Sequence, residues 1–388
     1  MSELQDYSDE IDFSDEAGDE FAEIFGQETD PLAQFQEGFE QASTDPFDWW
    51  MAKSIEPQEL AHGTMRSYWV AVDQWREFMA EQGRHPACPT ETHVLRWMYW
   101  LASEQGNTGT TIRGKLILLN RAFKYFAGSK KMPHPADYNP VSEARDTINV
   151  IKQFGDGDGR EEYYLSEQDV KDGLDSLRNL KKKLPVLMQF KLGLRVGEVR
   201  NLKIQHLNIT HPDIVEAYPS LGTNEHVEEH PNSVFIASRF TQEGNKSKNP
   251  AVLPIDYELR RLLVRWLLIR PSSDTDWLFV NDDHSRLNAR YVNRAWREGF
   301  HPRFEGSEQR KPLRSHYGRH WFTTFFRMEV GMNEALIQYM RGDVITGDLD
   351  YEDVVDGRRG SKAIYSYLHG HFEQIEGTYR EYMPDFGQ

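Results

Sequence analysis

Apolar side chains between residues 58 and 150 recur every three or four positions, which is the spacing of one face of an α-helix. Two apolar stripes have this spacing: Tyr68, Val72, Trp75 and Met79, and Ile112, Leu116, Leu119, Phe123 and Phe126. Segment 94–101 lies between them and is apolar and aromatic enough for a buried helix. The pattern therefore predicts a bundle of helices over this part of the chain.

The pattern changes in the second half of the chain. Ser166 precedes an apolar helical run and Asp169 follows three residues later, a variant of the capping box that marks the start of a helix. Short apolar runs around a polar turn predict paired strands. The predicted elements are strands at 234–237, 251–255 and 277–280 and a helix at 256–269. The fold class is predicted as mainly α (α+β): a helical domain, then an α-rich domain with a small antiparallel sheet.

Composition divides the chain into four predicted segments. These are an acidic, disordered arm at 1–55, a helical domain at 56–150, a linker at 151–164 and a second domain at 165–388. The arm is rich in Asp, Glu, Gln, Ser and Gly, so it cannot bury enough apolar area to offset chain entropy. The linker contains alternating Gly and Asp residues, and the glycines supply flexibility.

Charge is distributed unevenly along the chain. The formal charge is −17, but residues 1–55 hold 16 acids and one base. The other 333 residues hold 44 bases against 46 acids, and no acid occurs between Glu104 and Asp137. A locally basic surface on a chain with a separate acidic arm suits nucleic acid binding. The arm either mimics DNA, recruits an accessory protein through its phenylalanines, or only keeps the chain soluble.

One helical segment combines an apolar stripe with cations. At about 100° per residue, Arg113, Arg121 and Lys124 fall opposite the stripe at 112–126. Soluble helix faces usually interleave both signs of charge, and acids are missing here. These three residues, together with Lys115, are therefore predicted to contact the DNA backbone.

Composition also excludes several classes of protein. No run of about 18 apolar residues could span a bilayer, and the first residues lack the basic and apolar regions of a signal peptide. Cys88 is the only cysteine, which rules out an internal disulfide and a thiolate metal cluster within one chain. We expect a cytoplasmic protein with no membrane partner, no metal and no cofactor.

Five short stretches, in fixed order, predict a phosphoryl-transfer site. They are Gly-Leu-Arg195, Lys246-Ser-Lys248, His316-x-x-Arg319, Gly342-Asp343 and Tyr367-Leu-His369. Transfer of a phosphodiester requires charge stabilisation on the non-bridging oxygens, an in-line nucleophile and a proton for the leaving oxygen. A tyrosine, two arginines, a lysine and a histidine can supply these functions without metal or ATP.

Each requirement has a candidate side chain. Arg195 and Arg319 can each grip two phosphate oxygens, which lysine cannot do. His316 lies three residues before Arg319, so the two share a helix face. Lys246 or Lys248, in the polar turn, can protonate the leaving oxygen. A tyrosine suits the role of nucleophile because its phenolate, with a pKa of about 10, is a better leaving group than an alkoxide.

In this order the segments resemble the catalytic domain of the tyrosine recombinase, or phage integrase, family, over roughly residues 60 to 388. Gly-Leu-Arg195-x-x-Glu-Val is similar to the first arginine box, and His316-x-x-Arg319-His to the second. The hairpin that ends in Val-Leu-Pro254 resembles the lysine turn. Gly-Asp343 resembles the Leu-Gly-His box, and Tyr367-Leu-His the terminal Tyr-x-His. The C-terminal part is similar to archaeal integrases in particular.

The resemblance implies a site-specific DNA recombinase or integrase that cleaves and rejoins strands through a 3′-phosphotyrosine intermediate. Tyr367 would be the nucleophile, and counting back from Pro254 favours Lys246 over Lys248 as the proton donor. The first domain would be the family's core-binding domain, and the protein would act as a tetramer on paired DNA sites. The helix at 372–383 would pack on a neighbouring protomer.

Two departures from the family pattern open alternatives. Asp343 replaces the usual His or Trp, so a group that repels phosphate, unless protonated or turned away, stands where a donor is expected. An acidic insertion at 348–356 separates this position from Tyr367, which makes Tyr365 a rival nucleophile. The insertion's carboxylates could bind a divalent cation, although a solvated loop is the simpler interpretation.

Two other functions fit the same residues. A type IB topoisomerase would use the same chemistry to relax supercoils, and a DNA-binding regulator of the same fold would have lost cleavage. The helical first domain favours recombination over relaxation. The joint presence of Arg195, His316 and Arg319 argues against a loss of cleavage.

Overall fold

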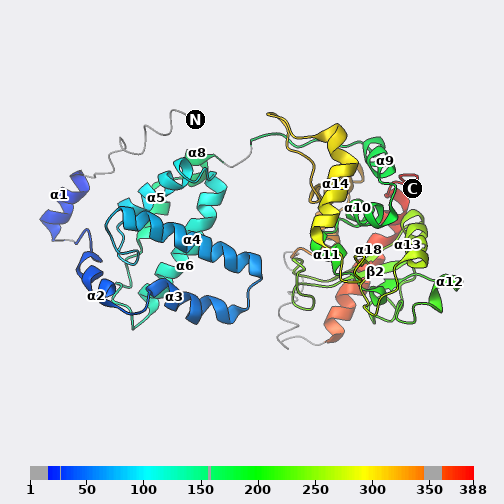
Figure 1. Ribbon diagram of the computed structural model, residues 1–388, viewed down its shortest axis with the longest axis horizontal. Coiled ribbons are helices and arrows are strands. Elements are labelled where there is room, and N and C mark those ends of the chain that lie inside the picture. Colours follow the sequence, from blue (N-terminus) through cyan, green and yellow to red (C-terminus); the bar gives the residue numbers. More distant parts are fainter. Residues whose placement is uncertain (1–15, 27, 156–158, 345–360) are drawn as a thin grey trace. The chain divides into compact units, whose positions relative to one another are not determined.

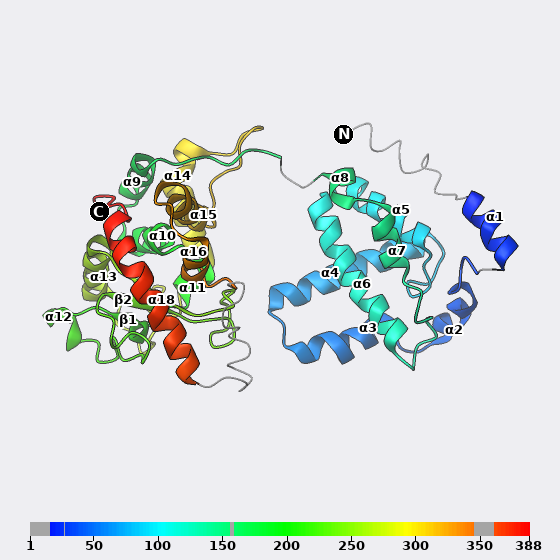
Figure 2. The same cartoon turned by 180° about the vertical axis from the view of Figure 1, so that it is seen from behind.

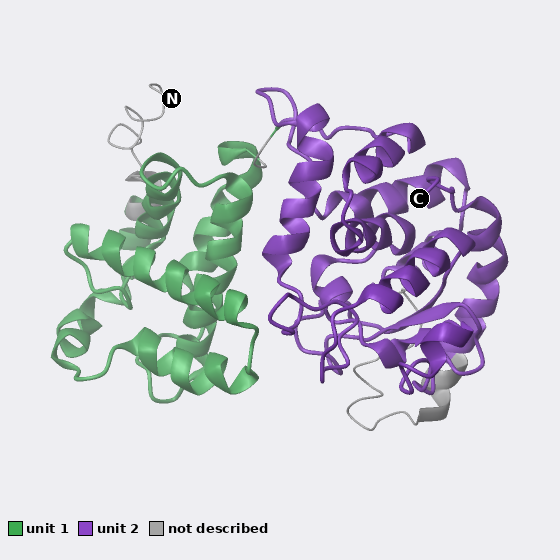
Figure 3. Cartoon of the chain, turned by 45° about the vertical axis from the view of Figure 1, so that its right-hand side comes forward, with its two compact units in different colours: residues 1–159 green, residues 160–388 purple. Residues whose placement is uncertain are grey.

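The computed structural model describes residues 16–26, 28–155, 159–344 and 361–388 (Figure 1). The chain divides into two compact units, residues 1–159 and 160–388 (Figure 3). Here they are called the first unit and the second unit, and each is considered by itself. The division falls within the predicted linker.

Five helices build most of the first unit: α4 (His62–Glu81), α5 (Glu91–Ser103), α6 (Gly109–Gly128), α7 (Pro140–Thr147) and α8 (Val150–Phe154). The two apolar stripes that predict helices lie on α4 and α6 and are buried in one core. Local signals set the helix starts. Thr90 and His93 form a capping box at α5, and Asn139 caps α7 with Pro140 in its first turn.

The expected disordered arm differs from the structure between residues 28 and 55. This segment forms short helices, α2 (Gln36–Gln41) and α3 (Pro46–Trp50), and α1 (Glu16–Phe25) precedes it. Phe47 and Trp50 are fully buried, and the Phe47 ring packs edge-on against Phe123 and Phe126. Arg76 pairs with the acids that begin α3. The arm is polar on average, but its aromatic cluster at 47–50 buries enough apolar area to join the core.

The second unit begins with helices α9 (Glu167–Ser176), α10 (Leu180–Leu192) and α11 (Val196–Arg200). The predicted capping box of Ser166 and Asp169 is present at α9. After the sheet come α13 (Tyr257–Ile269), α14 (Ala289–Phe304), α15 (Tyr317–Thr324), α16 (Glu334–Met340) and α18 (Ser361–Tyr382). Figure 2 shows α18 running along the unit, with β1 and β2 beside α13 and α18 and with α9, α10, α14 and α15 above them. The predicted fold class is confirmed.

A three-stranded antiparallel sheet lies inside the second unit, in the order β1 (Leu207–Asn208), β2 (Ser233–Ile236), β3 (Ala251–Pro254). Val234 stands opposite Leu207 on one side and Leu253 on the other. Every residue of β2 and β3 is buried, which explains why these strands are continuous apolar runs.

The sheet differs from the prediction at two places. Strand β1 is only two residues long and has no periodic signal of its own. Segment 277–280, predicted as a strand, makes only single bridges, Trp277 to Lys203 and Val280 to Arg286. Its apolar residues satisfy the strand pattern, but they pack as buried loop residues instead of joining the sheet.

The C-terminal helix packs on its own unit. The apolar face of α18 contributes Phe372, Ile375, Tyr379 and Met383 to the core of the second unit. The Tyr379 hydroxyl donates to the Lys191 carbonyl at 2.9 Å. The apolar face of this helix is therefore covered within its own unit, and packing of 372–383 on a neighbouring protomer stays a prediction. None of the described helices is long and apolar enough to cross a membrane.

Candidate active site

The first predicted arginine lies in a tight connection between two helices. Helix α10 ends at Leu192, and Gly193 continues in the left-handed conformation with φ of +63°. A Cβ at this glycine would lie 2.7 Å from the Phe322 ring, so no other residue fits without displacing that ring. The turn places Arg195 at the N-cap of α11.

A buried carboxylate and a hydroxyl orient Arg195. Its Nη1 donates to Glu198 Oε1 at 2.9 Å and to Ser247 Oγ at 3.0 Å. Its backbone N–H donates to the other Glu198 oxygen at 2.8 Å. The Glu198 side chain is only 1% exposed, so it is a fixed counterion and not a mobile surface acid. The guanidinium is thereby held in one orientation.

The second predicted arginine is almost completely buried. Arg319 lies in the first turn of α15 with 2% of its surface exposed. Its Nη1 donates to the Gly193 carbonyl at 3.1 Å, and its Nη2 donates to the Arg341 carbonyl at 2.9 Å. Burial, with a further contribution from the charge of Arg195, lowers the pKa of Arg319 to about 10. The side chain therefore stays charged at neutral pH.

The two arginines meet at one oxygen. Asp343 Oδ1 lies 3.3 Å from Arg195 Nη2 and 3.0 Å from Arg319 Nη2. The other carboxylate oxygen lies 3.0 Å from Arg341 Nε. Asp343 was expected to repel phosphate unless it was turned away. Instead, its carboxylate points into the site and occupies the donors of both arginines.

The turn between β2 and β3, residues 237–250, lies beside these groups and is called the lysine turn below. Its core is anchored: Asn201 Nδ2 donates to the Glu243 carbonyl at 3.0 Å and to Asn245 Oδ1 at 2.8 Å. Ser247, which contacts Arg195, is buried. Lys246 and Lys248, on either side of it, are exposed. The structure thus places both candidate proton donors in the turn that touches the arginine site.

His316 precedes α15 and is exposed. Partial desolvation, followed by the positive charges of Arg319, Arg195 and Arg341, lowers the pKa of His316 below its usual 6.5. The imidazole is therefore neutral at pH 7 and able to accept a proton. His316 lies three residues before Arg319, at the start of the helix that carries this arginine.

Tyr367 lies on α18 and is 6% exposed. Its ring centroid is 5.5 Å from that of Tyr339 and 4.7 Å from that of His371. Its hydroxyl oxygen is buried. The hydrogen bonds that the structure describes for Arg195 and Arg319 do not include this hydroxyl. Tyr365 also lies on α18, but its side chain is outside the described residues, as is the acidic insertion at 348–356.

Two residues at the site were missed by sequence reasoning. Ser247 donates to Glu198 Oε1 and accepts from Arg195, and Arg341 contacts Asp343. Ser247 lies between two lysines that carry the obvious signal. Arg341 immediately precedes the Gly342-Asp343 pair, where attention falls on the carboxylate. No spacing rule distinguishes either residue from its neighbours, because their roles depend on tertiary contacts.

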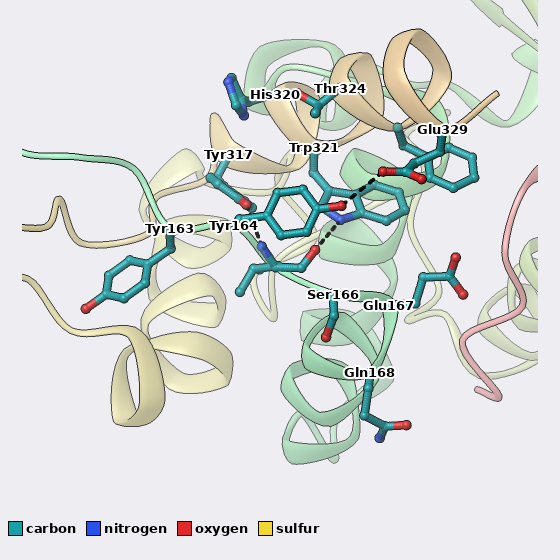
Figure 4. Close-up of a pocket in the computed structure, with 12 residues that line it drawn as sticks. Tyr163, Tyr164, Ser166, Glu167, Gln168, Tyr317, His320, Trp321, Thr324 and Glu329 are labelled. Atoms are coloured by element: carbon teal, nitrogen blue, oxygen red, sulfur yellow. Dashed lines mark hydrogen bonds between the residues drawn. The ribbon is translucent and has the colours of Figure 1, made fainter. Parts of the chain in front are cut away.

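Figure 4 shows a hollow of about 380 Å³ beside α15. Arg319 does not line it, because the helix period places this residue on a different face of α15. Tyr317, Trp321 and Thr324 line it from the helix. The Tyr317 hydroxyl accepts from the Leu165 backbone N–H at 3.0 Å, and the Trp321 indole donates to the Leu165 carbonyl at 3.0 Å. These contacts attach the start of the second unit to α15. The hollow is separate from the arginine site.

The four cations predicted to contact DNA lie on α6 of the first unit, but they are not equivalent. Arg113, Arg121 and Lys124 are exposed, but Arg121 also donates to the Tyr68 hydroxyl. Lys115 is half-buried, and its ammonium donates to Gln74 and, at 3.0 Å, to Asn107. Lys115 is therefore engaged within the unit. Within the described ranges no group of three or more His, Cys, Asp or Glu side chains is placed to hold a metal ion.

The second unit is mainly helical with a small antiparallel sheet, and two arginines from separate helices meet there at one carboxylate oxygen. Residues 164–342 match the phage integrase family. The second unit therefore contains a segment that is similar to the phage integrase family. The matched segment includes Arg195, Lys246, His316 and Arg319 and ends one residue before Asp343.

A curated protein of Caldanaerobacter subterraneus subsp. tengcongensis, named as a tyrosine recombinase, is 25% identical over 161 residues. The match covers 41% of this chain and 52% of that protein, so the chain matches about half the length of this relative.

Several solved structures share the fold. A Tn1549 transposon integrase in complex with transposon right end DNA has a TM-score of 0.55 at 15% identity, over 76% of this chain and 90% of that one. A lambda integrase tetramer bound to a Holliday junction gives 0.55 at 12%, over 79% and 78%. The XerH recombinase bound to a palindromic difH substrate gives 0.53 at 16%, over 81% and 78%. At these identities the likeness shows the fold alone.

Proposed function

We propose that this protein is a site-specific DNA recombinase that cleaves and rejoins strands through a 3′-phosphotyrosine intermediate. The observation that carries the proposal is the convergence of Arg195 and Arg319 on one anionic oxygen. Guanidinium N–H groups that meet at one oxygen are suited to the charge that develops on a non-bridging phosphate oxygen during transfer. The family of the second unit supports the same chemistry.

In the proposed reaction, Tyr367 attacks the scissile phosphorus in line with the 5′ oxygen. A bond forms between phosphorus and the phenolic oxygen, and the bond to the 5′ oxygen breaks. Arg195 and Arg319 stabilise the charge on the non-bridging oxygens. The 5′ hydroxyl of the partner strand later attacks the phosphotyrosine and reverses the step, so the bond energy is conserved without ATP.

Two proton transfers balance each step. His316 accepts the phenolic proton of Tyr367, because its lowered pKa keeps the imidazole neutral. Lys246 donates a proton to the leaving 5′ oxygen, and Lys248 is the alternative donor in the same turn. In rejoining, the two residues exchange roles.

Attack requires that Tyr367 leaves its present packing. Its hydroxyl oxygen is buried beside the rings of Tyr339 and His371, where a phosphodiester cannot reach it. The start of α18 must therefore move, or the ring must rotate outward, when DNA binds. This conformational step would control cleavage.

The proposed substrate is double-stranded DNA, held by the exposed cations of α6 and exchanged between paired sites by a tetramer. The lambda integrase structure is described as a tetramer on a Holliday junction, and this chain is proposed to assemble in the same way. The reaction would take place in the cytoplasm. An accessory protein that binds the acidic arm remains a prediction.

The test is covalent trapping. Bound sites are first selected from random duplex DNA, and nicked duplexes of the selected site are then incubated with the full chain. The wild type should form an adduct that resists denaturation. Tyr367→Phe should form none, and Tyr257→Phe, at an exposed tyrosine of the same unit, should form as much as wild type. An adduct with Tyr367→Phe that disappears in Tyr365→Phe would transfer the role to Tyr365.

DNA binding without cleavage is the second candidate function. It is favoured by the burial of the Tyr367 hydroxyl and by the occupation of both arginines by Asp343. Tight, selective binding with no adduct on any selected site would support it. Relaxation of supercoiled DNA with no preferred site would instead indicate a topoisomerase.

A further inference from the structure

The carboxylate of Asp343 is the anion that accepts from both arginines. Its Oδ1 receives one Nη2 from each of Arg195 and Arg319, at 3.3 and 3.0 Å. A non-bridging phosphate oxygen is suited to the same two donors. These donors are called the anion seat below. Because one oxygen cannot stand where another already stands, a phosphate can enter the seat only when the carboxylate leaves it.

The backbone that carries this carboxylate is fixed. The Gly342 carbonyl accepts from the N–H groups of Lys248 and Asn249 at 2.9 and 3.2 Å. Gly342 has φ of +64°, and a Cβ there would lie 2.7 Å from the Ser247 Cβ. The Asp343 N–H donates to the Gln338 carbonyl at 3.0 Å. Side-chain rotation is therefore the available way for the carboxylate to leave the seat.

Arg341 offers the carboxylate a second partner. Its Nε lies 3.0 Å from Asp343 Oδ2, the oxygen that does not contact Arg195 or Arg319, and the two groups form an ion pair without hydrogen-bond geometry. The side chains of Arg341 and Asp343 are 31% and 29% exposed, so both have room to move. The Arg341 carbonyl accepts from Arg319, which fixes the backbone of this arginine relative to the seat.

We propose that Asp343 is an internal competitor for the scissile phosphate, and that Arg341 holds its carboxylate when a phosphate takes the seat. The identification of the phosphate as part of DNA rests on the proposed function. Because the Asp343 carboxylate must be displaced first, it lowers the affinity of the anion seat for any single oxyanion. DNA must then be held by many other contacts before its phosphate displaces Asp343, so the carboxylate selects against weakly held sites.

The first test uses inorganic sulfate as the probe of the seat. The Tm of the full chain is measured against sulfate concentration, with chloride keeping ionic strength constant, and the stabilisation gives a sulfate Kd. Asp343→Asn keeps the shape but removes the charge. It should bind sulfate about ten-fold more tightly than wild type. If the Asn variant does not fold, Asp343→Ser replaces it.

The matched control is Asp172→Asn, which removes another arginine-paired carboxylate of the second unit. Asp172 pairs with Arg303. Sulfate stabilises folded proteins generally, and this variant measures that effect. Its sulfate Kd should equal that of wild type.

Arg341→Lys tests the second partner, because it keeps the charge and loses the Nε contact. It should weaken sulfate binding several-fold when Asp343 is present and have no effect in the Asp343→Asn background. Equal effects in both backgrounds would show that Arg341 acts only as a nearby charge and would remove it from the proposal.

The proposal is overturned if Asp343→Asn binds sulfate no more tightly than wild type, because the carboxylate would then be a structural counterion. Sulfate binding requires no cleavage, so this outcome is separate from failure of the proposed function. Tighter sulfate binding by Asp343→Asn without an adduct in any variant would support the competitor and reject the recombinase. If the wild type forms an adduct, and Asp343→Asn changes neither sulfate binding nor the adduct rate, the recombinase is supported and the competitor is rejected.

Discussion

Both units carry basic residues suited to phosphate, but they hold them in opposite ways. On α6 of the first unit, Arg113 and Lys124 extend into solvent. In the second unit, Arg319 is 2% exposed, and backbone carbonyls and a carboxylate fix its donors. The first unit therefore provides positive charge without a fixed geometry, whereas the second unit provides fixed hydrogen-bond donors that converge on one point.

The difference separates affinity from chemistry. Exposed cations bind the DNA backbone by releasing counterions. Their contributions to DNA affinity therefore add up, depend on salt concentration and do not require a fixed orientation of the side chain. Fixed donors in a desolvated site stabilise charge where it develops, and their effect on rate is much larger. Substitutions in the second unit should therefore change the cleavage rate, whereas substitutions on α6 should change binding.

The largest effect is expected at Arg319. Arg319→Lys keeps the charge but loses the fork that reaches Gly193, Arg341 and Asp343 at once. The rate of adduct formation on a nicked duplex should fall about a thousand-fold. Arg303→Lys, at a half-exposed arginine of the same unit, should cleave at the wild-type rate. A fall of less than about three-fold at Arg319 would show that the fixed geometry does not matter.

His316 should give the next largest effect, and a pH dependence. The neutral imidazole is the form that accepts a proton, and its pKa is lowered below 6.5. The cleavage rate should therefore be constant between pH 7 and 8 and fall as pH decreases through that lowered value. His316→Gln should cleave about a hundred-fold more slowly and lose this acidic limb. An unchanged acidic limb in this variant would assign the titration to another group.

Ser247 should have a smaller effect on both rate and stability. Ser247→Ala leaves the buried Glu198 carboxylate without one donor and releases one contact of Arg195. The free energy of unfolding should fall by about 1–3 kcal/mol, and the cleavage rate by about ten-fold. Urea denaturation and adduct kinetics measure the two. Ser285→Ala removes a hydroxyl that donates to an exposed carboxylate and should change neither.

Much of this comparison could be predicted from sequence. The stripes of α4 and α6 and the runs of β2 and β3 follow from periodicity, because one face or both faces of each element are buried. The placement of Arg195 and Arg319 at one site was predicted from the order of short motifs and their resemblance to a family. The structure brings these two side chains together at Asp343.

The rest depends on tertiary contacts that sequence does not encode locally. From sequence, Asp343 is expected to repel phosphate. Its pairing with Arg195 and Arg319 becomes visible only when the positions of the two arginines are known. The average polarity of the arm predicts disorder, and how much of the arm the burial of Phe47 and Trp50 would order depends on the core that they contact. The exposure of each cation on α6 also depends on residues outside that helix. The Lys115 ammonium donates to Gln74 and Asn107, and helix periodicity does not predict these contacts.

The smallest effects are expected on α6, where one helix carries its own control. Single substitutions of Arg113 or Lys124 by Ala should weaken binding of non-specific duplex DNA a few-fold and reduce the slope of log affinity against log salt by about 1. Lys115→Ala should leave that slope unchanged, because its ammonium donates to Gln74 and Asn107. It should instead reduce the free energy of unfolding by about 1 kcal/mol. Equal salt slopes for all three variants would mean that exposure does not decide which cations bind DNA, and the distinction between the two units would then rest on the cleavage data alone.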